Sequence, residues 1–158
     1  MLREQRQEEA LKILSEALQN ADRLLDEGEK GDLRLQAMRF TIRFNLACCH
    51  DDANRIGEAT ELFEQLIKEE PSYTDAYMRL AYLARKRGDM KRAVEYIEQA
   101  KSKHNKDPNH SLPTKLYCMK GRLLTEMGNP SEALAEYSKA LDLSSKRDSY
   151  ARVGIANI

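Results

Sequence analysis

The sequence predicts an all-α protein built from repeated pairs of antiparallel helices, about eight helices that wind into a right-handed superhelix. Good helix formers dominate, whereas glycine (7) and proline (4) are scarce among the 158 residues. Residues 9–18 (EALKILSEAL) and 132–141 (EALAEYSKAL) are identical at six of ten positions, which indicates an internal repeat. Runs of alternating β-branched residues between turn clusters do not recur, so no sheet is expected.

Alanines seven residues apart mark the second helix of each pair. They recur at Ala93 and Ala100, and again from Ala59, where Leu66 takes the place of the second alanine. Small residues let paired helices cross closely, while the large residues between them fill the gaps. The spacing from Ala59 to Ala93 is 34 residues and the next is 40, with the surplus in the polar segment 101–110, which predicts a lengthened turn.

The residues between paired helices suit tight turns. Gly88 and Gly128 follow predicted first helices, where a glycine supplies the left-handed conformation that ends a helix. Asn54 holds the same place in the preceding pair, and asparagine is the next most tolerant residue.

Two helix starts carry capping signals. Residues 129–132 combine Asn129 as a cap, Pro130 at the first helical position and a carboxylate at the third. Ser72 and Asp75 have the spacing of a capping box, which predicts a second start at Ser72.

We therefore expect a single array over residues 1–158. It divides into a half repeat (4–25), full repeats at about 40–71, 74–107 and 114–145, and a half repeat at 147–158. The alanine of the opening half repeat and the matching alanine of the first full repeat are 49 residues apart instead of 34. The two helices between them should therefore be long and joined by a turn at Gly28–Gly31. Solenoids generally end in a polar capping helix, and none is evident, so we expect a piece of a longer protein.

Composition and charge exclude several classes of function. Positive and negative residues number 26 each, so no net field attracts nucleic acid or a membrane surface. No apolar run approaches the ~20 residues of a membrane span, and the N-terminus is too charged for a signal peptide. Three cysteines without a CxxC spacing indicate free thiols in a reducing compartment.

Catalytic and metal-binding patterns are also missing from the sequence. It has no Gly-rich phosphate loop after a strand, no HExxH and no plausible pairing of a nucleophile with histidine. Cys48, Cys49 and His50 are consecutive, and consecutive helical side chains point about 100° apart, so they cannot converge on one ion. The many carboxylates follow helical surface spacing, which is typical of a solvated face. We therefore expect neither an enzyme nor a cofactor, metal or small-molecule substrate.

The repeated residues resemble the 34-residue tetratricopeptide (TPR) pattern in three copies. The matching positions are Leu46, Ala47, Ala59, Phe63, Leu66 and Pro71, then Tyr77, Leu80, Ala81, Ala84, Gly88, Ala93, Ile97 and Ala100, then Tyr117, Gly121, Leu124, Gly128, Ala133, Tyr137 and Ala140. This resemblance implies a scaffold that holds protein partners in a concave groove.

A narrower resemblance concerns three segments. FNLACCHD (44–51), EEPSYTDAYMRLAYLARKRGD (69–89) and DSYARVGIANI (148–158) look like the TPR subunit of the RNA polymerase II-associated factor (Paf) elongation complex. The third full repeat, GRLLTEMGNPSEAL (121–134), departs from that family toward a generic TPR. The resemblance implies a nuclear scaffold of transcription elongation that binds the other subunits of its complex. The alternative is a generic TPR adaptor in a cytoplasmic or nuclear assembly.

The candidate partner-binding residues follow from the TPR pattern, in which fixed positions of each first helix face the groove. Those singled out here are Phe44, Cys48, Met78, Tyr82, Arg85 and Arg122. Large apolar groups among them favour a site for a peptide or protein segment. Alternatively, a neighbouring helix of a longer parent covers the same strip.

Two further binding classes can be weighed. Co-chaperone TPR domains hold a C-terminal carboxylate through a clamp of Lys and Asn, but Phe44 and Cys48 stand at those places, and Met119 replaces a clamp arginine. Basic residues gather between Arg85 and Lys106, which suggests a phosphate-binding patch as an alternative. Stacking aromatics are not interleaved with these charges, so we favour solvated helix faces and expect no nucleic-acid partner.

Overall fold

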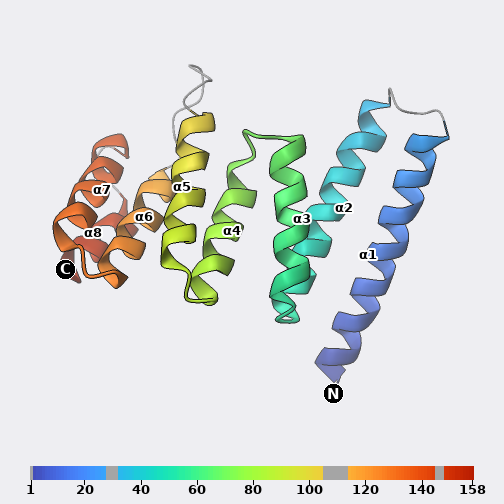
Figure 1. Cartoon of the computed structure of the whole chain (residues 1–158), viewed down its shortest axis with the longest axis horizontal. Helices are drawn as coiled ribbons and strands as arrows, with labels where there is room; N and C mark the ends of the chain where they lie inside the picture. Colours follow the sequence, from blue (N-terminus) through green and yellow to red (C-terminus); the bar gives the residue numbers. More distant parts are fainter. Residues whose placement is uncertain (1, 28–31, 105–113, 145–147) are drawn as a thin grey trace. The chain divides into compact units, whose positions relative to one another are not determined.

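A computed structural model describes residues 2–27, 32–104, 114–144 and 148–158, and within these ranges it contains eight helices and no strand (Figure 1). The helices are α1 (Leu2–Asp26), α2 (Leu33–Asp52), α3 (Ile56–Glu69), α4 (Thr74–Lys86), α5 (Met90–His104), α6 (Thr114–Glu126), α7 (Pro130–Leu143) and α8 (Ser149–Ala156). The predicted all-α class is confirmed. None of the described helices is both long and apolar enough to cross a bilayer.

The helices form two compact units, Met1–Glu70 (unit 1) and Pro71–Ile158 (unit 2). That the two continue as a single TPR array stays a prediction.

Unit 1 contains α1, α2 and α3, with α2 packed against both neighbours. Helix α1 has 25 residues and α2 has 20, whereas α3 to α7 have 13 to 15, so the predicted lengthening is confirmed. The predicted turn at Gly28–Gly31 lies outside the described residues. Phe63 and Leu66 of α3 are fully buried, and Ala21, Leu25 and Leu35 form a smaller apolar cluster between α1 and α2.

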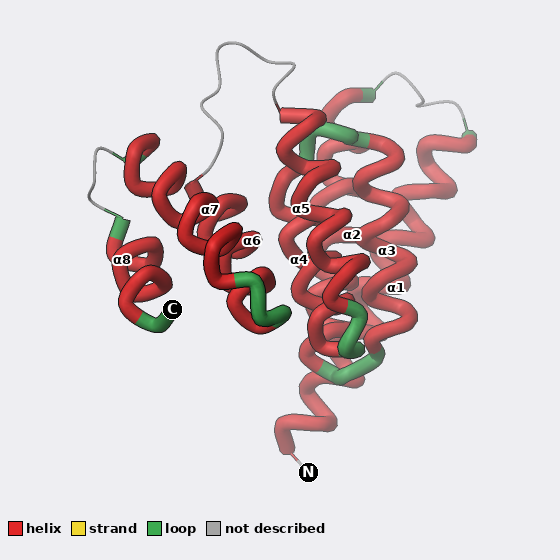
Figure 2. The backbone as a smooth tube through the Cα atoms, turned by 60° about the vertical axis from the view of Figure 1, so that its left-hand side comes forward, coloured by secondary structure: helices red, strands yellow, loops and turns green. Residues whose placement is uncertain are grey.

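Unit 2 consists of the helix pairs α4–α5 and α6–α7, followed by α8. Figure 2 shows the short turns that join the helices within each pair. Helix α5 packs on α6, and α8 packs on both α6 and α7. Ala93 and Ala133, the small residues that predicted close helix crossings, have no exposed surface. The predicted lengthened turn in 101–110 is wrong at 101–104, because α5 continues to His104, and its remainder lies outside the described residues.

The three predicted left-handed turns are confirmed. Gly88, Gly128 and Asn54 have φ angles of 83°, 78° and 58°. In each case the N–H of the next residue donates a hydrogen bond to a carbonyl in the last turn of the preceding helix. In α4, for example, the Asp89 N–H donates to the Ala84 carbonyl at 2.9 Å. These bonds satisfy carbonyls that would otherwise be left without a partner at the helix end.

The helix starts agree less well with their predicted chemistry. Pro130 is the first residue of α7, as predicted, but the Asn129 side chain makes no capping bond. The predicted start at Ser72 is wrong: α4 begins at Thr74 after Tyr73, which also makes no side-chain cap. Ser72 instead accepts a hydrogen bond at its carbonyl from the Thr74 hydroxyl, at 3.3 Å, because the chain is still turning there.

Candidate protein-binding groove

A groove of about 740 Å³ lies along α4, α6 and α8 in unit 2. It is lined by Met78, Tyr82, Arg85, Lys115, Cys118, Met119, Arg122, Leu123, Thr125, Glu126, Tyr137, Asp148, Tyr150, Val153, Gly154 and Asn157. Helices α4 and α6 are the first members of their pairs, and α8 begins the final half repeat. Apart from Tyr137 on α7, the lining therefore comes from the helices that the TPR pattern assigns to the concave face and from residues that flank α8.

The groove exposes large apolar side chains. Tyr82 on α4 is 39% exposed, while Tyr150 and Val153 on α8 are 81% and 60% exposed. Met78 and Met119 line the same groove and are half-buried. Exposed apolar groups gathered in a concave surface mark an interaction site more strongly than scattered ones, because a partner can bury them together.

A cluster of three charged side chains lies at the junction of α4 and α6. The Arg85 Nε lies 2.7 Å from Glu126 Oε2, and the Arg122 Nε lies 3.2 Å from Glu126 Oε1. The hydrogen bond from Arg85 is the main reason that the pKa of Glu126 is held below its ordinary value. Glu126 is therefore a carboxylate at neutral pH, and it holds both guanidinium groups beside the apolar lining.

Cys118 is the thiol within the groove. Burial, reinforced by the nearby Asp148 carboxylate, raises the pKa of Cys118 to about 11. The thiol is protonated at neutral pH, and a protonated thiol is a poor nucleophile. Burial also raises the pKa of Cys49 and lowers that of His50. The described part of the chain has no group of three His, Cys, Asp or Glu side chains placed to hold a metal ion.

Four of the six predicted site residues come together. Met78, Tyr82, Arg85 and Arg122 all line the groove of unit 2. Phe44 and Cys48 belong to unit 1, where Phe44 is half-buried and meets the ring of Phe63 edge-on, with centroids 5.6 Å apart. Phe44 therefore contributes to packing within its own helix pair. The partner-binding role of all six residues stays a prediction.

Sequence reasoning missed several groove residues, including Glu126, Tyr150 and Asn157. Glu126 could have been found, since it follows Arg122 by four residues, the spacing of an ion pair on a helix. The ion pair between Glu126 on α6 and Arg85 on α4 could not have been predicted, because it joins two helices that are distant in the sequence.

The basic stretch from Arg85 to Lys106 is partly neutralised within the molecule. Arg85 pairs with Glu126, Arg92 pairs with Glu95 at 3.1 Å, and Lys101 pairs with two glutamates. Lys106 lies outside the described residues. These ion pairs lower the positive charge available to a phosphate backbone, so they support the preference for solvated and paired helix faces.

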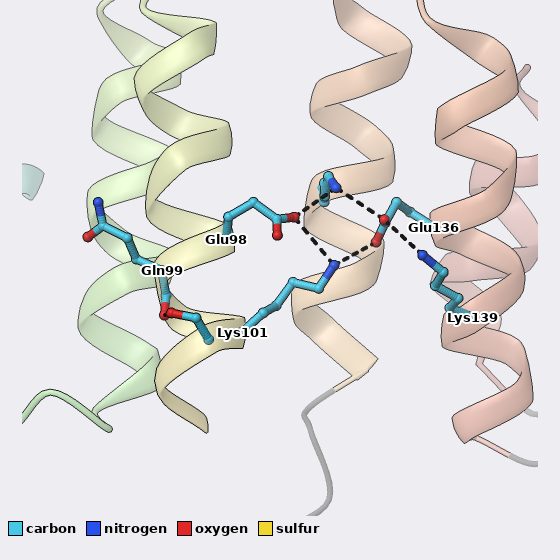
Figure 3. Close-up of polar contacts among 7 residues, drawn as sticks. Glu98, Gln99, Lys101, Glu136 and Lys139 are labelled. Carbon is cyan, nitrogen blue, oxygen red and sulfur yellow. Dashed lines mark hydrogen bonds and ion pairs between the residues drawn. The ribbon is translucent and has the colours of Figure 1, made fainter. Parts of the chain in front are cut away.

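A buried carboxylate outside the groove lining joins α5, α6 and α7 (Figure 3). Glu136 is 5% exposed, with Lys101 Nζ at 3.0 Å and Lys120 Nζ at 3.1 Å, and Lys120 also meets Glu98 at 2.7 Å. Burial disfavours the charged form, but the two lysines outweigh it and lower the pKa of Glu136. The expectation that the glutamates occupy solvated faces is wrong at this position, because three helices converge on it.

Three comparisons relate the chain to known proteins. A family model described as the TT21 fifth ARM repeats domain matches residues 49–152. The chain is 27% identical over 135 residues to a protein named "Protein CTR9 homolog" from Arabidopsis thaliana, covering 85% of this chain and 12% of that protein. It is 36% identical over 60 residues to the "RNA polymerase-associated protein CTR9" of Caenorhabditis elegans, covering 38% of this chain and 5% of that protein.

The chain thus spans only a small part of these relatives' length. Among solved structures, it is similar to YrrB, described as a TPR protein with an unusual peptide-binding site. The TM-score is 0.59 at 18% identity, covering 85% of this chain and 62% of YrrB. This likeness establishes a TPR-like fold, which agrees with the repeat pattern in the sequence.

Proposed function

Because the chain belongs to the family of the TT21 fifth ARM repeats domain, we propose that it acts as a non-catalytic scaffold whose unit 2 groove holds protein segments. The observation that carries this proposal is the convergence of Met78, Tyr82, Arg85 and Arg122 on one groove with exposed apolar walls. Such grooves take up peptides by burying a few anchor side chains, with charges at the edge providing orientation.

The partners we propose are the other subunits of a Paf-type transcription elongation complex, in the nucleus. This proposal is supported by the two relatives named CTR9, one of them called RNA polymerase-associated, and by the three segments that resemble the Paf TPR subunit. A generic TPR adaptor function is the second candidate, favoured by the likeness to YrrB with its peptide-binding site.

A capture experiment tests the role of the groove. Met78→Ala combined with Tyr82→Ala should reduce capture of recombinant Paf-type subunits by the whole chain at least ~30-fold, since truncating central anchors typically costs 2 kcal/mol or more. Tyr82 is partly exposed and Met78 half-buried, so the helical circular dichroism signal should survive.

The matched control is the double charge reversal Lys91→Glu with Arg92→Glu on α5, at exposed positions outside the groove. Capture by this variant should stay within about twofold of the wild type. If the control loses capture and the groove variant keeps it, the binding surface lies on α5 and the proposal fails. If the wild type captures none of these subunits but binds other peptides through Tyr82, the generic adaptor is the better description.

A further inference from the structure

The guanidinium groups in the groove outnumber the carboxylates that bind them. Arg85 and Arg122 share Glu126, and each reaches it through its Nε. Two guanidiniums together offer about ten N–H donors, whereas one carboxylate offers about four acceptor positions. The pair therefore has both positive charge and hydrogen-bonding capacity left over for another acceptor.

Unit 1 shows what a matched pair looks like in this protein. Arg39 and Arg43 on α2 lie between two carboxylates, Asp22 on α1 and Glu69 on α3. Asp22 lies 3.6 Å from Arg39 and 3.9 Å from Arg43, and Glu69 meets both arginines as well. The two arginines of unit 1 are thus balanced by two carboxylates. Arg85 and Arg122 are bound by one carboxylate, that of Glu126.

The remaining charges of the groove do not supply the missing carboxylate. Lys115 adds a third positive charge to the lining, and Asp148 adds a second negative one, which leaves an excess of one positive charge. The Asp148 Oδ1 accepts a hydrogen bond from the Ala151 N–H at 3.1 Å, so this carboxylate caps the start of α8. The apolar lining next to the arginines lowers the local polarity, which strengthens any ion pair formed there.

We propose that the occupant of this groove is an acidic segment of a partner protein. An apolar side chain of the segment lies on the wall between Tyr82 and Tyr150, and a neighbouring Asp or Glu carboxylate bridges Arg85 and Arg122. The two methionines, with flexible thioether side chains, let the wall adapt to the shape of the apolar group. This inference rests on the proposed function of the groove and adds the charge of the segment it accepts.

The experiment compares defined peptide pools on the whole chain. Each pool holds fluorescent, C-terminally amidated 12-residue peptides with Leu, Phe and Tyr at the same positions, and with Glu, Gln or Lys at all others. The wild type should bind the Glu pool at least 5-fold more tightly than the Gln pool. Arg122→Glu should abolish this preference and shift it toward the Lys pool, since the Arg122 side chain is 65% exposed and its replacement leaves the core intact.

Controls separate this inference from the proposed function. Lys91→Glu, an equal change of charge on exposed α5, should keep the wild-type preference for Glu. If the wild type binds the Glu and Gln pools equally and Tyr82→Ala loses both, the acidic preference is overturned and the groove remains a peptide site.

If none of the pools binds, both proposals are overturned. Tighter binding of a single-stranded uridine 20-mer, lost in Arg122→Glu, would assign the arginines to phosphate instead.

Discussion

Replacing Glu136 with alanine should destabilise unit 2 by about 2–4 kcal/mol, measured as the free energy of unfolding in urea at neutral pH. The substitution removes the carboxylate that Lys101 and Lys120 share, and the side chains of these lysines are only 13% and 18% exposed. Their charges would remain at the junction of α5, α6 and α7 with little access to water. Glu98, whose side chain is 48% exposed, would be left as the one carboxylate shared by both lysines. Removing one partner from a buried ion network costs more than the ion pair itself contributes.

Lys139→Ala is the matched control, because Lys139 contacts the same carboxylate at 3.4 Å but its side chain is 56% exposed. It should cost about 1 kcal/mol or less. Equal effects of the two substitutions would show that the buried position of Glu136 is unimportant.

The same network predicts a dependence on pH. The pKa of Glu136 and that of Glu98 are lowered in the folded state, so the folded chain binds fewer protons than the unfolded one. Their stabilisation is therefore fully present above the unfolded glutamate pKa of about 4.3 and is lost as the pH falls below it, through the lower folded values. Between neutral pH and about pH 3.5, the wild type should lose more stability than Glu136→Ala does. An equal loss would contradict the assignment.

Gly154→Ala should detach α8 from α7 and cost about 1–3 kcal/mol in unfolding free energy. A Cβ at position 154 would lie 2.3 Å from Cε1 and Cζ of the Tyr137 ring. Tyr137 is 5% exposed and also faces Gly121, where a Cβ would lie 2.9 Å from the ring, so it has little room to move. Because Tyr150 and Val153 reach the groove from α8, peptide binding should weaken together with stability.

Gly57→Ala is the contrasting case. A Cβ at Gly57, in α3, would meet nothing within 4 Å, so alanine should leave stability unchanged or raise it by up to about 1 kcal/mol. Thermal unfolding of the two variants, with hydrogen exchange of the α8 amides, measures the difference. If Gly154→Ala behaves like Gly57→Ala, the close approach of α8 to Tyr137 does not matter for stability.

The elements that the sequence predicted well are those fixed by local geometry. The spacing of small residues such as Ala93 located the second helices, because only small side chains suit a close crossing. Gly88, Gly128 and Asn54 marked the left-handed turns, since few residues adopt that conformation without strain.

The features that escaped prediction depend on contacts between helices distant in the sequence. Glu136 has the spacing of a solvated residue, and only the convergence of α5 and α6 on it makes it buried. Arg85 meets Glu126 across 41 positions of sequence, which no local pattern reveals. Phe44 suits the groove positions of the TPR pattern, yet its ring packs against Phe63 of its own pair. The groove helices could therefore be predicted, but the charge balance within the groove could not.

The most direct test of the central claim is a methyl NMR titration of the whole chain, with carbon-13 in the methionine methyl groups, by the recombinant Paf-type subunits. Met78 and Met119 line the groove, whereas Met90 and Met127 lie outside its lining at the turn ends of α5 and α6. If the groove of unit 2 holds the partner segment, the Met78 and Met119 signals should shift with the partner concentration while those of Met90 and Met127 stay in place. Shifts at Met90 or Met127 with Met78 and Met119 unmoved would contradict the claim and locate binding on another surface.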